Sequence, residues 1–145
     1  MRSWWLTLSL VLCLASPLAA RKETVPDLLA RVQAAAEKDR PRLYIKLARL
    51  RLEDADHLYH NRQPGQARAA VEDIVGYADQ AYTAADHSGK RLKDTEISIR
   101  KIADKLRDIR RGLEFEDQAP VQAAVDHLEE LRTKLLTRMF GKGAK

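Results

Sequence analysis

The most informative absences in this sequence concern residues with special chemistry. Its only cysteine, Cys13, and both of its tryptophans, Trp4 and Trp5, lie within the first 20 residues. The rest of the chain therefore excludes thiol catalysis, cysteine-ligated zinc, iron–sulfur clusters and the thioether attachment of haem. The sequence also lacks a glycine-rich phosphate loop, a Gly-x-Ser-x-Gly motif and a His-Glu-x-x-His motif. We therefore predict that the protein is not an enzyme.

Long apolar runs are absent except at the N-terminus. An apolar stretch over residues 4–15 follows Arg2 and ends at Ser16 and Pro17, and small residues lead to Ala20. A charged start, a short apolar core and a small-residue exit are typical of a cleaved secretory signal peptide. A retained membrane anchor is the alternative, but such a helix usually needs about 20 apolar residues. We expect residues 1–20 to be a signal peptide and the mature protein to be extracytoplasmic, either periplasmic or secreted.

The remaining chain shows no sustained alternation of apolar and polar residues, so no strand is predicted. Apolar residues recur at spacings of three and four instead, which is the helical pattern. Prolines and glycines divide this pattern into five predicted helices, over residues 26–37, 41–61, 66–87, 92–113 and 120–140. We expect an all-α fold in which four long helices form an up-down-up-down bundle and the short first helix closes one end or lies across the base. One domain would span residues 21–140, followed by a flexible tail at 141–145.

The fourth predicted helix carries the clearest core pattern. Two interleaved series of residues repeat every seven positions there: Leu92, Ile99, Leu106 and Leu113, and between them Thr95, Ile102 and Ile109. This is a heptad seam over three repeats. The third predicted helix buries small residues instead, which predicts a close approach of its neighbours. Thr24 with Asp27, and Ser88 with Gly89, are placed to cap the start of the first helix and the end of the third.

The charge of the chain is concentrated in one segment. The whole sequence carries a formal net charge of +5, and residues 90–111 contain nine basic and four acidic side chains. The candidate partner-binding residues in this segment are Lys93, Arg100, Lys101, Arg107 and Arg111. A positive stripe of this kind attracts an acidic protein, an anionic polymer or an anionic lipid surface. An ordinary solvated face is the alternative, because acidic residues are interleaved at helical spacing.

The histidines suggest one candidate metal site. Glu53, His57 and His60 are spaced i, i+4 and i+7, so they share one side of the second predicted helix. Imidazole and carboxylate groups on one helical face can ligate zinc, copper or iron. A di-iron bundle site would need two Glu-x-x-His pairs, which this sequence lacks. Our favoured interpretation therefore includes no cofactor, and a metal- or haem-binding bundle is the alternative.

Taken together, these patterns predict a non-enzymatic exported protein that acts through its surface. We expect an interaction or structural module of the cell envelope whose partner is a protein or an anionic envelope component. Nucleic acid is not expected, since the aromatic and glycine-loop readers are missing and an exported protein rarely meets it. A peripheral membrane-surface protein is the second alternative.

Overall fold

The computed structural model describes residues 22–141, and this part of the chain is helical apart from short turns. A short 3₁₀-helix, η1, separates the first two of five α-helices. The elements are α1 (Val25–Ala34), η1 (Glu37–Asp39), α2 (Arg40–His60), α3 (Pro64–Ser88), α4 (Leu92–Arg111) and α5 (Phe115–Phe140). The all-helical prediction is confirmed for these residues. The predicted signal peptide and residues 142–145 of the predicted tail lie outside the described residues.

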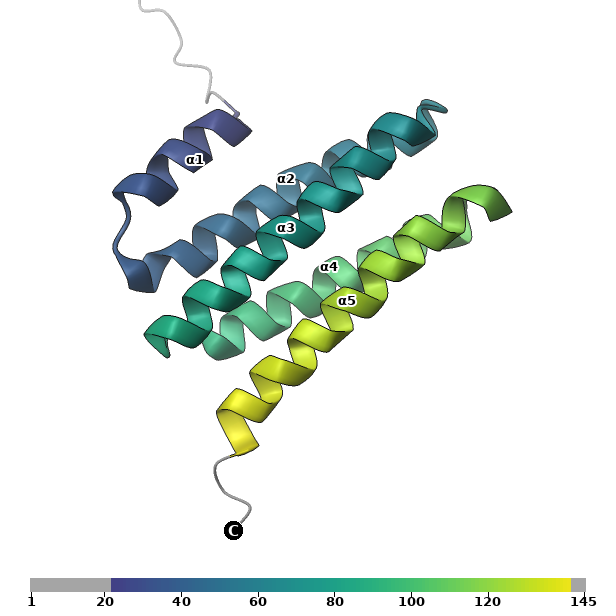
Figure 1. Cartoon of the computed structure of the whole chain (residues 1–145). Helices are drawn as coiled ribbons and strands as arrows, with labels where there is room; N and C mark the ends of the chain where they lie inside the picture. The colour runs from purple at the N-terminus through teal and green to yellow at the C-terminus, as the bar shows by residue number, and fades with distance from the viewer. Residues whose placement is uncertain (1–21, 142–145) are drawn as a thin grey trace, which may run out of the picture.

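The four long helices form two antiparallel hairpins that pack on each other (Figure 1). One hairpin consists of α2 and α3, and the other of α4 and α5. Between the hairpins α2 lies beside α4 and α3 beside α5, so these neighbours run in parallel (Figure 1). The link from α3 to α4 therefore crosses the bundle diagonally, and among the described residues α2 does not pack against α5. The short α1 packs against α2 alone among the described helices.

The predicted caps form as expected at two helix ends. At the start of α1 the Thr24 hydroxyl accepts from the amide of Asp27, and the Asp27 carboxylate accepts from the amide of Thr24 at 3.2 Å. At the end of α3, Gly89 has a φ of 63°, the left-handed conformation that glycine adopts easily. The first helix ends at Ala34, three residues earlier than predicted, because Ala35 is extended and the chain restarts as η1.

The heptad seam of α4 lies in the core, as predicted. Ile99 and Leu106 are fully buried, whereas Leu92 and Leu113 at the ends of the seam are partly buried. Five alanines of α3 are also completely buried: Ala67, Ala70, Ala78, Ala81 and Ala85. Because alanine side chains are short, they let α3 approach its neighbours closely, and its most extensive contact is with α2. None of the described helices is long and apolar enough to cross a bilayer.

The predicted start of the last helix is wrong. We expected Pro120 to begin it, but α5 begins at Phe115 and Pro120 is its sixth residue. Because only the first four amides of a helix lack an intrahelical partner, a proline at this later position costs one backbone hydrogen bond, the one to the carbonyl of residue 116. The Gln118 side chain donates to the carbonyl oxygen of Leu113 at 3.0 Å, which anchors this first turn. The local contacts outweigh the loss of one hydrogen bond.

Candidate functional site

One column of basic residues on α4, spaced seven positions apart, divides into free and compensated charges: Lys93, Arg100 and Arg107. Lys93 and Arg100 are exposed, and neither has an ion pair among residues 22–141. Arg107 is instead held on both sides, because its guanidinium donates to Asp104 and to Glu129 of α5, each at 2.6 Å. The structure thus places Lys93 and Arg100 on the surface and uses Arg107 to join two helices.

The other two predicted partner-binding residues also differ from each other. Lys101 is exposed and unpaired within the described part of the chain. Arg111 lies 3.2 Å from the carboxylate of Asp108, and both side chains are well exposed. An exposed pair of this kind contributes little and is screened by salt, so Arg111 keeps much of its accessible charge. Three of the five candidates, Lys93, Arg100 and Lys101, therefore carry uncompensated charge.

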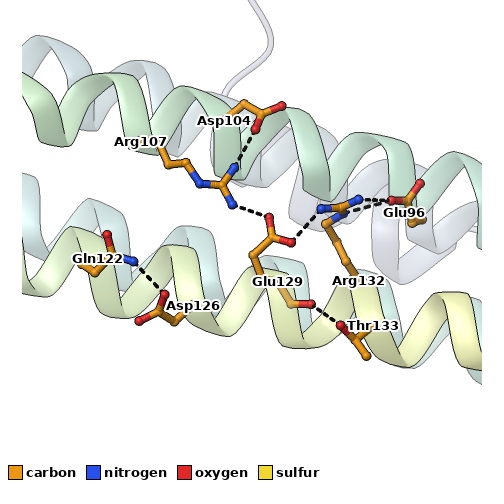
Figure 2. Close-up of polar contacts among 8 residues, drawn as sticks. All are labelled: Glu96, Asp104, Arg107, Gln122, Asp126, Glu129, Arg132 and Thr133. Atoms are coloured by element: carbon orange, nitrogen blue, oxygen red, sulfur yellow. Dashed lines mark hydrogen bonds and ion pairs between the residues drawn. The ribbon is translucent and has the colours of Figure 1, made fainter.

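Arg107 belongs to a relay of charged side chains between α4 and α5 (Figure 2). Its partner Glu129 also accepts from Arg132 at 2.6 Å. Arg132 then donates to Glu96 of α4 at 2.9 Å, and Glu96 is only 8% exposed. Two ion pairs thus join α4 to α5, Arg107 with Glu129 and Glu96 with Arg132. Glu129 and Arg132 are also paired with each other within α5. This relay fixes how α4 is rotated against α5.

The pKa of Arg132 reflects its place in the relay. Burial acts against the charged guanidinium, and this is the largest single effect. The hydrogen bond to Glu96, together with the charge and hydrogen bond of Glu129, outweighs burial and raises the pKa of Arg132 above its ordinary value. The guanidinium is therefore fully protonated at any physiological pH and serves as a permanent link.

The candidate metal ligands are not gathered into a site. Glu53, His57 and His60 are all exposed, and the Nδ1 of His60 donates to the backbone carbonyl of Asp56 at 2.8 Å. Across residues 22–141, no group of three or more His, Cys, Asp or Glu side chains is arranged to hold a metal ion. His127, which could have joined these ligands from α5, is not beside them, because α5 packs on α3 rather than α2. Within the described part of the chain, the structure thus shows no cluster of ligands for the metal-binding alternative.

Two adjoining cavities lie at the hairpin tips, where α2 turns into α3 and α4 turns into α5. Their volumes are about 470 and 480 Å³, and both are lined by Tyr59, His60 and Leu113. Burial, followed by the charge of Asp117, raises the pKa of the Tyr59 hydroxyl. No serine, threonine or cysteine lines either cavity. The only hydroxyl group among the residues that line these two cavities is therefore the phenol of Tyr59.

A second basic group was missed by the sequence analysis. Arg42, Lys46 and Arg49 of α2 line a cavity of about 360 Å³ together with Arg91, the residue before α4. The signal for the first three was present, since they are spaced i, i+4 and i+7 and so share one edge of a helix. Arg91 could not be added to them from the pattern, because it reaches them only through the parallel packing of α2 and α4.

The function of the chain has to be inferred from the position and charge of its own residues. No family model, no curated protein and no solved structure matches this chain.

Proposed function

We propose that this protein is an exported, non-enzymatic helical bundle that binds an acidic protein or an anionic component of the cell envelope. The contact would be made by the α4 basic surface, defined as Lys93, Arg100 and Lys101. The observation that supports this proposal is the contrast within one helix. These three side chains are exposed without an ion pair among the described residues, whereas Arg107 is neutralised by Asp104 and Glu129.

The α4 basic surface is well suited to rapid, salt-sensitive capture of an anionic partner. Exposed cations steer an oppositely charged partner towards the protein and accelerate association. Their attraction is screened beyond about 8 Å at physiological ionic strength, so binding should weaken as salt rises. The relay between α4 and α5 holds the helix that carries the cations, so little backbone ordering would accompany binding.

Reversal of the three charges tests this proposal. In the variant Lys93→Glu/Arg100→Glu/Lys101→Glu, we expect capture of partners from native envelope extract to fall at least tenfold, because attraction becomes repulsion. Helicity in the far-ultraviolet circular dichroism spectrum should be unchanged, since all three side chains are exposed. The measurement is a quantitative pull-down at low and high salt.

A control with the same change in net charge separates this surface from charge in general. Lys38, Arg62 and Arg68 are also exposed but lie outside α4. Reversal of these three to glutamate should reduce capture less than twofold. Equal losses in the two triple variants, or no loss in the α4 variant, would remove the α4 basic surface as the binding site.

A second candidate function, peripheral association with a membrane surface, is favoured by the end of α5. Leu136 and Phe140 are 38% and 72% exposed and lie one helical turn apart. Antiparallel packing puts this end of α5 beside the start of α4, where Lys93 lies (Figure 1). Exposed apolar side chains next to cations are typical of proteins that lie in the interface of an anionic bilayer.

Vesicle flotation tests this second candidate. We expect the protein to float with anionic vesicles at low salt, and the variant Leu136→Ser/Phe140→Ser to bind at least tenfold more weakly. The reason is that transfer of a phenylalanine side chain out of water is worth about 2 kcal/mol. Phe115→Ser is the control, because Phe115 is 87% exposed at the opposite end of α5. Failure of the unmodified protein to float excludes membrane association.

A further inference from the structure

A strongly cationic cavity lies between the N-terminal halves of α2 and α4. The two helices are parallel neighbours and begin at the same end of the bundle (Figure 1). Four cations line the cavity of about 360 Å³, Arg42, Lys46 and Arg49 from α2 and Arg91 from the turn before α4. Its only acidic lining residue is Asp94, whose side chain is 74% exposed.

The wall contributed by α4 adds hydroxyl groups to these cations. Thr95 and Ser98 line the cavity opposite the arginines of α2. The Ser98 hydroxyl oxygen accepts from the Arg49 guanidinium at 3.3 Å, so its own proton is left for another acceptor. Guanidinium and hydroxyl donors from two helices thus converge on one space, which is how oxyanions are held in proteins.

The charges of the cavity are only partly compensated by the protein. Lys46 lies 3.3 Å from the carboxylate of Glu23, and Arg91 lies 3.2 Å from that of Asp39. Arg42 and Arg49 have no ion pair at all within the described residues. Two guanidinium groups therefore remain available to a ligand, each with several N–H donors.

The backbone at Arg91 supports a binding role for the cavity. Arg91 has a φ of 58°, a left-handed conformation that is unfavourable for a residue with a side chain. It is kept there because its Nε donates to the carbonyl oxygen of Lys38 at 3.1 Å. No side chain caps the start of α4, so the free amides and the positive end of the helix dipole lie near the cationic cavity.

We propose that this cavity, lined by Arg42, Lys46, Arg49 and Arg91, binds a phosphoryl group. A carboxylate carries one charge and is satisfied by one guanidinium, whereas a phosphate monoester carries nearly two and offers three acceptor oxygens. Two free arginines with a lysine and hydroxyl groups match the larger charge and the tetrahedral shape. The cavity is also within the volume range of small-molecule sites, which begins at about 300 Å³.

Two residues of the α4 basic surface, Lys93 and Arg100, are separate from this phosphoryl site. Ser98 contacts Arg49 of α2, whereas Arg107, in line with Lys93 and Arg100, contacts Glu129 of α5. Lys93 and Arg100 therefore lie on the opposite edge of α4 from the cavity, whereas Lys101, three residues after Ser98, lies on the same side of the helix as Ser98. The phosphoryl site is additional to the proposed partner contact, and substitutions can remove either of the two without the other.

Calorimetric titration with inorganic phosphate tests the site. In Arg42→Gln/Arg49→Gln, we expect the affinity for phosphate to fall at least tenfold, because both uncompensated guanidinium groups are removed. Lys93→Gln/Arg100→Gln removes the same charge from the opposite edge of α4, and its affinity should change less than twofold. All four side chains are exposed, so circular dichroism should show that both variants stay folded. No phosphate binding by the unmodified protein, or equal losses in both variants, overturns the proposal.

Vesicles distinguish the two sources of a phosphoryl group. Phosphatidylcholine vesicles with and without phosphatidic acid supply the group on a bilayer, and glycerol 3-phosphate supplies it in solution. Flotation that requires phosphatidic acid and is lost in Arg42→Gln/Arg49→Gln identifies a lipid headgroup as the ligand. Binding of glycerol 3-phosphate without such flotation identifies a soluble phosphorylated ligand. Either result supports the site. If Arg42→Gln/Arg49→Gln keeps both the vesicle flotation and the glycerol 3-phosphate binding of the unmodified protein, the proposal is contradicted.

Discussion

Replacement of Arg132 with alanine is expected to lower the free energy of unfolding by about 3 kcal/mol, because it leaves a buried carboxylate without its partner. Glu96 is 8% exposed, and Arg132 donates to it at 2.9 Å. The same substitution also removes one of the two arginines that bind Glu129. Urea denaturation followed by circular dichroism measures the loss, with the slope of the transition as a check that the unfolded state is unchanged.

Two further variants identify the origin of this loss. Lys134→Ala breaks an exposed ion pair with Glu130 on the same helix, and we expect it to leave the urea midpoint almost unchanged. Glu96→Leu/Arg132→Met replaces the buried pair with apolar groups and should recover most of the stability lost in Arg132→Ala. If Arg132→Ala is no more destabilising than Lys134→Ala, the relay does not hold the two helices together.

The relay also explains why only part of the basic helix is available for binding. Glu129 faces α4 between Arg107 and Arg132, so it neutralises a cation that the sequence pattern placed among the partner-binding residues. Lys93 and Arg100 belong to the same column but remain free. A charged residue on a predicted helix face therefore becomes a binding candidate only when the carboxylates of the neighbouring helix are known.

Local interactions explain the part of the fold that could be predicted. The heptad seam around Ile99 and Leu106 is a periodicity within one helix, and burial follows directly from it. The Thr24–Asp27 cap involves residues three positions apart, so its geometry is also set by local sequence. The start of α5 could not be read from the position of Pro120. The turn before this proline is held by contacts that the helical pattern does not reveal, such as the hydrogen bond from the Gln118 side chain to the carbonyl oxygen of Leu113.

The packing of the two hairpins could not be predicted from these local patterns. The same apolar faces are compatible with α4 lying beside α3 or beside α2, since both arrangements bury the heptad seam. The observed one places α2 next to α4, and it brings Arg91 to Arg42 and Arg49 across 42 or more positions of the chain. It also keeps His127 away from His57 and His60. Both the proposed phosphoryl site and the separation of His127 from the candidate metal ligands follow from this one packing arrangement.

Replacement of Leu106 with alanine is expected to have a similarly large effect, a loss of about 3 kcal/mol in the free energy of unfolding and of about 10 °C in melting temperature. Leu106 is completely buried in the α4 seam, so its truncation removes apolar burial and leaves a cavity in a close-packed core. Leu136→Ala is the matched control, because Leu136 is 38% exposed and its truncation should cost less than about 1 kcal/mol. Thermal and urea denaturation of both variants measure the difference. Equal losses would mean that the heptad seam does not form the core. The orientation of α4, on which both proposed binding sites depend, would then be set by the charged relay alone.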